Sequence, residues 1–323
     1  MFYRSNIVAL VGGGSLPTYV SNKLMIWDDN KTKVISEFKF TTQVKNVKLR
    51  QDRIFIVVEQ KIFVFDFKTF QELDTIDTSD NPNGTFALNT DPNVTIIAYP
   101  ADMGTSTDEV VGYVQIKGYE TDMNSLIAAH QSKIGFLALN HDGSLLATAS
   151  EKGTIIRVFE TSSGSFLQEV RRGRDKTVIY HMCFNSNSLL LAATSNKGTV
   201  HIWSLKECKK KLGSNHNDND MPHNKVSLFK GLPYFISGGF FKSEWSFAQV
   251  RIDDTTTKAI CCFTEDNCLV VVTQGGWYYK ARIDMVKGGE CLIIKKDSLI
   301  EVSNSINVNE REKELVGNND IMV

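Results

Sequence analysis

The stretch Leu-Leu-Ala-Thr-Ala-Ser-Glu-Lys-Gly-Thr, residues 145–154, returns as Leu-Leu-Ala-Ala-Thr-Ser-Asn-Lys-Gly-Thr, residues 190–199. In each copy an apolar run leads into a Lys-Gly turn, and a second run of β-branched and aromatic residues follows at 155–159 and 200–203. This pattern is typical of two antiparallel strands. The copies begin 45 residues apart, at Leu145 and Leu190, and four-stranded propeller blades repeat every roughly 40–45 residues. The duplication therefore predicts an all-β propeller.

Weaker copies of the second strand extend the repeat in both directions. They lie at 23–27, 62–65, 113–116 and 277–280. With the two strong copies they indicate about six blade units, which together make up a propeller over residues 1–300. The first unit is incomplete, because only a few residues precede the strand-like run Ile7–Val11. An open ring exposes a sheet edge, so either the first blade is missing or the ring closes with fewer strands, and we favour a missing N-terminal blade.

Composition argues against several classes of function. The chain has 323 residues, of which 42% are apolar, and its 36 Lys and Arg residues nearly balance its 37 Asp and Glu residues. No overall charge attracts it to nucleic acid, so any anion site must be built locally. The N-terminus has no secretory signal, and no apolar run approaches the roughly 18 residues of a membrane span. The chain is expected to be cytosolic.

The six cysteines contain no C-x-x-C pair. Cys183, Cys261 and Cys262 lie inside apolar strand runs. Buried thiols in a reducing compartment explain this pattern more simply than a metal site does. The sequence therefore predicts neither a metal site nor a cofactor.

A long insertion is predicted at 206–245, between two strands of one blade, and a disordered polar tail at 301–323. The insertion begins with lysines, passes through an Asn/Asp-rich stretch and ends with aromatic residues. Lysines near an anionic leaflet and buried aromatic rings both favour membrane attachment. The candidate membrane contacts are Lys209, Lys210, Lys211, Phe229, Tyr234, Phe235, Phe240 and Phe241. Trp245 and Phe247 adjoin a strand, so they could equally pack against the propeller.

Other motifs do not support an enzyme. The run Val11–Gly14 is followed by no Lys-Ser/Thr, as a nucleotide-binding loop would require. The acidic pairs lack the spacing of a calcium loop. No nucleophile elbow or paired carboxylate motif is visible. We therefore predict that the protein is not an enzyme.

Several segments together resemble the PROPPINs, the autophagy propellers called WIPI proteins in animals. They are Thr148–Thr154, Arg171–Gly173, Gly198–Ile202, Val11–Gly14, Asn22–Asp29 and Ser243–Ala248. The resemblance covers about residues 7–294 and implies a propeller of the seven-bladed type. The chain departs from the family in having Val170 before Arg-Arg-Gly, and in lacking the family's first blade and the opening strand of its second.

Arg171 and Arg172 are adjacent at the end of a predicted strand. Successive side chains on a strand point to opposite sides, so Arg171 should lean towards the preceding blade and Arg172 towards the following one. A guanidinium offers planar, paired donors that suit phosphate oxygens. The arrangement predicts two separate head-group pockets, with the duplicated hairpins supplying Ser, Thr and Lys to their walls.

The resemblance implies which residues form each pocket. Pocket one would use His130, Ser150, Lys152, Thr154, Arg157 and Arg171. Pocket two would use Arg172, Ser195, Thr199 and His201. Two pockets on one membrane gain from effective concentration, even though each alone binds weakly.

These observations predict a protein that binds phosphatidylinositol 3-phosphate and phosphatidylinositol 3,5-bisphosphate. By resemblance it acts as a scaffold recruited to membranes during autophagosome formation, at the phagophore and at endosomal or vacuolar membranes. Its partners would be phosphoinositide-containing membranes and the large rod-shaped lipid-transfer protein of autophagy. The alternative is a WD-repeat-like protein scaffold without lipid binding.

Overall fold

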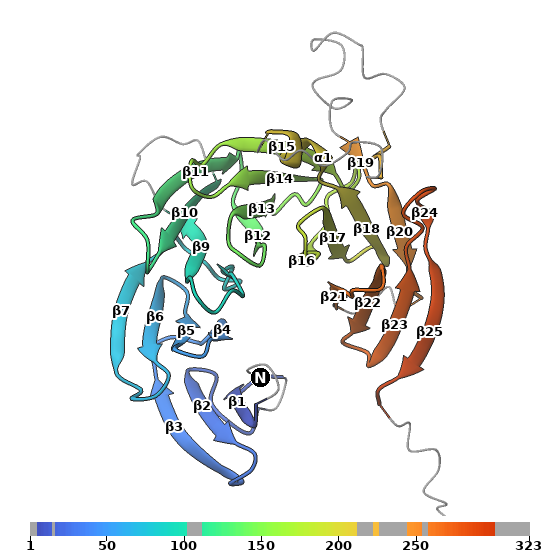
Figure 1. The fold of residues 1–323 in the computed structure, drawn as a ribbon. Helices are drawn as coiled ribbons and strands as arrows, with labels where there is room; N and C mark the ends of the chain where they lie inside the picture. The colour runs from blue at the N-terminus through green and yellow to red at the C-terminus, as the bar shows by residue number, and fades with distance from the viewer. Residues whose placement is uncertain are drawn as a thin grey trace, which may run out of the picture.

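The computed structural model describes residues 5–14, 17–101, 112–211, 222–225, 244–253 and 258–300. Within them the protein is almost entirely β-structure, arranged as six antiparallel sheets of three or four main strands. The sheets follow one another in chain order around a central opening (Figure 1). The all-β propeller and its six blade units are confirmed, and the first sheet has three strands.

The main strands of each sheet are consecutive in the chain. The first three sheets comprise β1 (Ile7–Val11), β2 (Lys23–Asp28) and β3 (Lys33–Lys39); β4 (Asn46–Leu49), β5 (Arg53–Val57), β6 (Lys61–Asp66) and β7 (Glu72–Asp77); and β8 (Ala87–Leu88), β9 (Ile96–Ala101), β10 (Gly112–Gly118) and β11 (Asn124–His130). The last three comprise β12 (Ile134–Leu139), β13 (Leu145–Ser150), β14 (Ile155–Glu160) and β15 (Phe166–Arg171), with β19 (Glu244–Trp245); β16 (Ile179–Phe184), β17 (Leu190–Ser195), β18 (Thr199–Ser204) and β20 (Ala248–Arg251), with β24 (Gly289–Glu290); and β21 (Ala259–Phe263), β22 (Cys268–Thr273), β23 (Trp277–Arg282) and β25 (Leu292–Ser298).

The duplicated sequence forms the middle hairpins of the fourth and fifth blades. β13 pairs with β14, and β17 pairs with β18, both antiparallel. The glycine of each Lys-Gly turn has a positive φ, 59° at Gly153 and 65° at Gly198. This left-handed conformation favours glycine. Both turns therefore depend on the Lys-Gly dipeptide that made the repeat visible.

The hydrophobic core lies between neighbouring blades. Each cluster of buried side chains joins residues of one sheet to residues of the next, as Trp203 of β18 packs with Leu145 of β13 and Val170 of β15. The strands β13 and β17 are buried along their whole length. Blade-to-blade packing therefore fixes the position of the strand ends that carry the candidate site.

The insertion starts differently from the predicted loop. Its first six residues form a short helix, α1 (Lys206–Lys211). Lys and Glu, which make up most of this segment, are good helix formers. At its other end, β19 pairs in parallel with β15, Glu244 opposite Val170 and Trp245 opposite Arg171. The insertion therefore returns to the strand that ends in the paired arginines.

Two aromatic residues at the end of the insertion pack on the propeller. Phe247 is buried in the core between the fifth and sixth blades, and Trp245 is half-buried. Lys209, Lys210 and Lys211 belong to α1. The other five candidate membrane contacts, at 229–241, and the tail at 301–323 lie outside the described residues.

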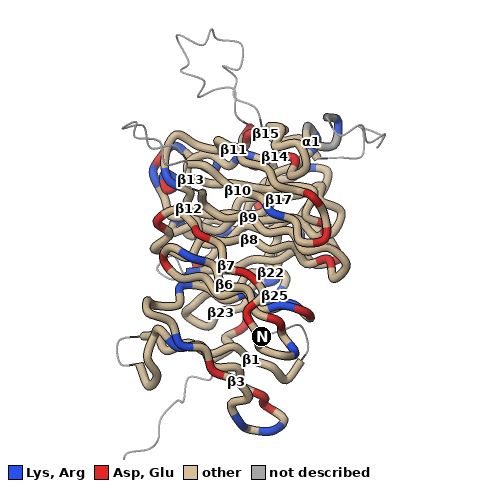
Figure 2. The backbone as a smooth tube through the Cα atoms, turned by 90° about the vertical axis from the view of Figure 1, so that its left-hand side faces the viewer, with Lys and Arg blue, Asp and Glu red and all other residues tan. Residues whose placement is uncertain are grey.

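Surface charge is mixed. Lys and Arg alternate with Asp and Glu along the side of the propeller seen in Figure 2, as expected from a net charge of −1. Among the described residues, no helix has the length and apolar character of a membrane span.

Our expectation that Cys262 is buried was wrong, because it is exposed while its neighbour Cys261 is buried. Adjacent residues on a strand face opposite sides.

Candidate functional site

The two arginines lie where β15 ends. Arg171 is its last residue, and the main-chain amide of Arg172 donates to the carbonyl oxygen of Thr154 at 2.9 Å. Only 9% of Arg171 and 6% of Arg172 is exposed. Burial lowers the pKa of both guanidinium groups, offset by Glu169 near Arg171 and by Asp175 near Arg172. Both remain cationic, since arginine stays protonated in proteins, and their surroundings differ.

The residues predicted for pocket one include a row that crosses from the third blade to the fourth. His130 ends β11 in the third blade, and its Nε2 lies 2.9 Å from Oγ1 of Thr148 on β13. Arg157 on β14 donates to the carbonyl oxygen of Ala129 at 2.7 Å and to Oε2 of Glu169 at 2.9 Å. His130 and Arg157 are thereby brought to one inter-blade boundary, and Arg171 lies near Glu169, the partner of Arg157.

The electrostatics of this row follow from its burial. Burial and then the charge of Arg157 lower the pKa of His130 to about 4. At neutral pH the imidazole is therefore uncharged. Glu169 lies directly opposite Arg157 in the β14–β15 register, and its carboxylate forms an ion pair with Nε of the Arg157 guanidinium. An entering phosphate would therefore compete with the Glu169 carboxylate for Arg157.

The residues predicted for pocket two lie near the next boundary, between the fourth and fifth blades. Arg172 donates from Nε to the carbonyl oxygen of Gly153 at 3.2 Å and from Nη2 to that of Asp175. Burial and then the charge of Arg172 lower the pKa of His201 on β18 to about 4. The buried Ser195 hydroxyl, at the end of β17, has no hydrogen-bond partner among the described residues. A buried polar atom of this kind favours a ligand or water beside it.

The remaining predicted residues lie around the two turns. Ser150 is buried at the end of β13, Lys152 is exposed in the following turn, and Thr154 is half-buried. The carbonyl of Thr154 is bonded to Arg172, so this turn adjoins both arginines. Thr199 begins β18 directly opposite Arg251 of β20.

Three supporting residues were not identified from the sequence. Trp203 is fully buried, stacks on His201 at a ring-centroid distance of 5.7 Å, and donates from Nε1 to the carbonyl oxygen of Arg171 at 3.3 Å. Ser246 lies 3.0 Å from Nδ1 of His201, and Glu169 pairs with Arg157. Alternation along β18 and β15 places Trp203 and Glu169 on the faces of His201 and Arg171. That signal was present in the sequence, whereas nothing local linked Ser246 to His201.

Replacing His130 by glutamine is expected to make the protein less sensitive to acid. The pKa of His130 is about 4 in the folded state and about 6.5 when unfolded. Between pH 6.5 and pH 4, His130 is protonated in the unfolded state but not in the folded state. The free energy of unfolding therefore falls as the pH is lowered from 6.5 towards 4. Between pH 6.5 and 5 the wild type should lose about 2 kcal/mol that the variant keeps. Urea denaturation at pH 7 and pH 5 measures this difference; an equal loss in both proteins would contradict it.

The sequence of this chain is similar to that of several known proteins. A model of the PROPPIN family matches residues 5–300. Autophagy-related protein 18e of Arabidopsis thaliana is 31% identical over 310 residues, which cover 95% of this chain and 78% of that protein. SVP1-like protein 2 of Emericella nidulans is 35% identical over 257 residues, which cover 78% of this chain and 77% of that protein.

Solved structures share the architecture. Kluyveromyces lactis Hsv2 matches with a TM-score of 0.68 and 22% identity over 93% of this chain and 85% of that one. KlAtg21, in a complex with the coiled coil of AgAtg16, matches with a TM-score of 0.71 and 24% identity over 93% of this chain and 84% of that one. At such identities the likeness is one of fold.

Proposed function

This chain belongs to the PROPPIN family, and from that premise we propose that it binds phosphatidylinositol 3-phosphate and phosphatidylinositol 3,5-bisphosphate on membranes. Pocket one would hold one head group around His130, Arg157 and Arg171. Pocket two would hold another around Arg172, Ser195 and His201. Thr199, Ser150, Lys152 and Thr154 would form the outer walls.

The observation that carries this proposal is the burial of two adjacent cations. Arg171 and Arg172 are each at least nine-tenths buried, and the hydrogen bonds described for Arg172 go to neutral carbonyl oxygens. Taking a charge out of water is unfavourable unless an opposite charge approaches it. Glu169 and Asp175 supply part of that charge, and a phosphate would add to it and matches the geometry of the guanidinium. The lone Ser195 hydroxyl adds a hydrogen-bonding group for the inositol ring or its phosphate.

The biological setting follows from the relatives. Because they are named as autophagy-related proteins, we place this propeller in autophagy, as a binding scaffold rather than a catalyst. The membranes would be those of the phagophore, the endosome or the vacuole, and the large lipid-transfer protein of autophagy is a proposed partner. A role for the aromatic residues at 229–241 in membrane contact stays a prediction.

A second function is favoured by the KlAtg21 complex. That protein binds the coiled coil of AgAtg16, so a propeller of this fold can serve as a docking platform for protein. Flotation with liposomes that carry 3-phosphorylated inositol lipids separates the two functions. Lipid binding predicts that flotation depends on both arginines, whereas a pure protein scaffold predicts no dependence.

Replacing Glu169 by glutamine is expected to strengthen binding of the soluble head group inositol 1,3-bisphosphate about two- to fivefold. The change removes the carboxylate that holds Arg157 at 2.9 Å, and such a partly exposed pair is worth about 1 kcal/mol at most. Titration calorimetry of the variant against wild type measures the gain. Glu160→Gln, at the far end of β14, makes the same change in net charge and should have no effect. An equal affinity in all three proteins would contradict the competition between Glu169 and phosphate.

A further inference from the structure

Three potential metal ligands meet on the inner strands of the fifth and sixth blades. His181 and Cys183 belong to β16, and Cys261 belongs to β21. The Nδ1 of His181 and the two Sγ atoms all lie within 4.8 Å of one another. His181 and Cys183 are two residues apart on one strand, so both side chains leave the same face of it. Contact between β16 and β21 then brings Cys261 to that face.

The spacing of the three atoms fits a tetrahedral zinc ion. The two sulfur atoms are 3.6 Å apart, and Sγ of Cys261 is 3.8 Å from Nδ1 of His181. Zinc–sulfur bonds of about 2.3 Å and zinc–nitrogen bonds of about 2.0 Å give tetrahedral edges of about 3.8 Å and 3.5 Å. Only small side-chain movements are needed to close the set.

The main-chain amide of Cys261 donates to Nδ1 of His181 at 3.4 Å, which holds the imidazole against β21. A zinc ion would replace this long hydrogen bond at the Nδ1 lone pair and would bind both cysteines as thiolates.

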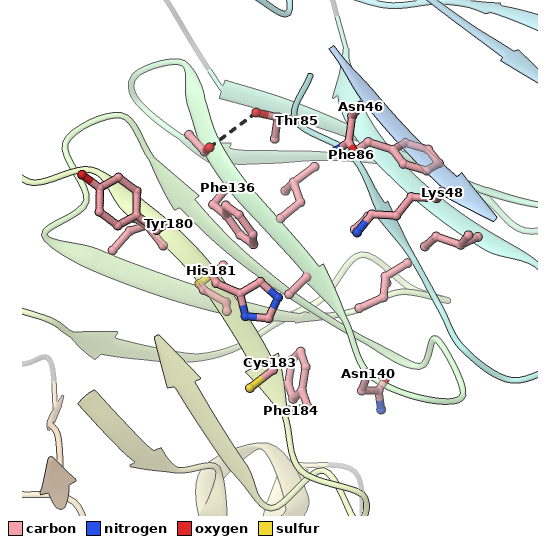
Figure 3. Close-up of a pocket in the computed structure, with 18 of the residues that line it drawn as sticks. Asn46, Lys48, Thr85, Phe86, Phe136, Asn140, Tyr180, His181, Cys183 and Phe184 are labelled. Carbon is pink, nitrogen blue, oxygen red and sulfur yellow. Dashed lines mark hydrogen bonds between the residues drawn. The ribbon is translucent and has the colours of Figure 1, made fainter. Parts of the chain in front are cut away.

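The fourth position would face an open pocket. His181 and Cys183 line a pocket at the centre of the propeller, together with Phe136, Phe184 and Lys48. Figure 3 shows the imidazole of His181 pointing into this space and Cys183 beside the ring of Phe184. Water or an exogenous ligand could therefore complete the coordination. Two cysteines and one histidine with an open fourth position form a known type of zinc site.

We propose that His181, Cys183 and Cys261 form a binding site for one Zn²⁺ ion, open to the central pocket and joining the fifth blade to the sixth. The ligands come from strands about 80 residues apart in the chain, as His181 and Cys261 are numbered. A bound ion would cross-link the inner edges of these blades. This site is distinct from the two head-group pockets and from their arginines.

The test uses the full chain, reduced and treated with a chelator before it is mixed with Zn²⁺ and desalted. Elemental analysis should find about one zinc per wild-type chain. Cys183→Ser and Cys261→Ser should each weaken zinc binding at least about tenfold, because loss of groups that only orient ligands already weakens it by about 10–100-fold. Cys262→Ser is the matched control: it removes the exposed neighbouring thiol on β21 and should retain zinc like the wild type. Cobalt in place of zinc should give thiolate charge-transfer absorption in the wild type and the control only.

Some results would overturn the site. They are no zinc on the reduced wild-type chain, equal retention by all four proteins, or a stable Cys183–Cys261 disulfide whose reduction yields no zinc binding. If the serine variants do not fold, alkylation of the wild type followed by peptide mapping decides the question. Zinc should protect Cys183 and Cys261 but not Cys262, and equal modification of all three thiols would overturn the assignment.

Discussion

Liposomes containing phosphatidylinositol 3-phosphate should no longer float the protein once Arg171 and Arg172 are both replaced by threonine. Charge-assisted hydrogen bonds contribute about 1.5–3 kcal/mol each. Loss of one guanidinium from each pocket should therefore weaken membrane binding more than about a hundredfold. Each single variant should retain one pocket and show an intermediate loss. Flotation of wild type and variants, on liposomes with and without the lipid, measures the effect.

Two further variants serve as controls for this experiment. Lys176→Thr removes one exposed cation from the loop that follows the arginines, and it should leave flotation unchanged. Arg171→Lys/Arg172→Lys keeps both charges but removes the paired donors, so it should bind more weakly than wild type and better than the threonine variant. Undiminished flotation of a folded threonine variant, checked by circular dichroism, would rule out the proposed pockets.

Trp203→Ala is expected to lower the free energy of unfolding by about 3–5 kcal/mol, the usual range for removing a fully buried large aromatic side chain. Trp203 has no exposed surface and packs between the fourth and fifth blades. Its removal also takes away the ring that stacks on His201 and the donor to the carbonyl of Arg171. Urea denaturation measures the loss.

Trp277→Ala provides the comparison. Trp277 is 38% exposed at the start of β23, and its replacement should change stability by no more than about 1 kcal/mol. Trp203→Phe keeps most of the packing and should fall between the two. A loss below about 1 kcal/mol in Trp203→Ala would show that the boundary between the blades does not depend on this ring.

The architecture could be predicted from the sequence because its signals are local. The 145–154 and 190–199 copies contain complete strand–turn–strand units, and Gly153 and Gly198 fix the turns by their own backbone preference. The second strand of each copy was predicted one residue short at 155–159 and two residues short at 200–203, compared with β14 and β18. Helix α1 was missed because a short polar segment has no apolar periodicity to reveal it.

The site could be predicted only in part. Arg171, Arg172 and the two histidines were identified from adjacent motifs and family resemblance. The carboxylate opposite Arg157 depends on the β14–β15 register, which residue spacing alone does not specify. Ser246 reaches His201 only after the long insertion has returned. The thiols of Cys183 and Cys261 are likewise 78 positions apart, and only packing of β16 against β21 brings them together.

The short parallel strand β19 also covers part of the outer edge of the fourth blade. An outermost strand presents unpaired main-chain groups that can template pairing with another chain and lead to aggregation. At the arginine end of β15 these groups are already paired with Glu244 and Trp245, and α1 contacts the same strand. β24 covers β20 in the same way. Part of the outer edge of the fourth and fifth blades is therefore unavailable for pairing with a second copy.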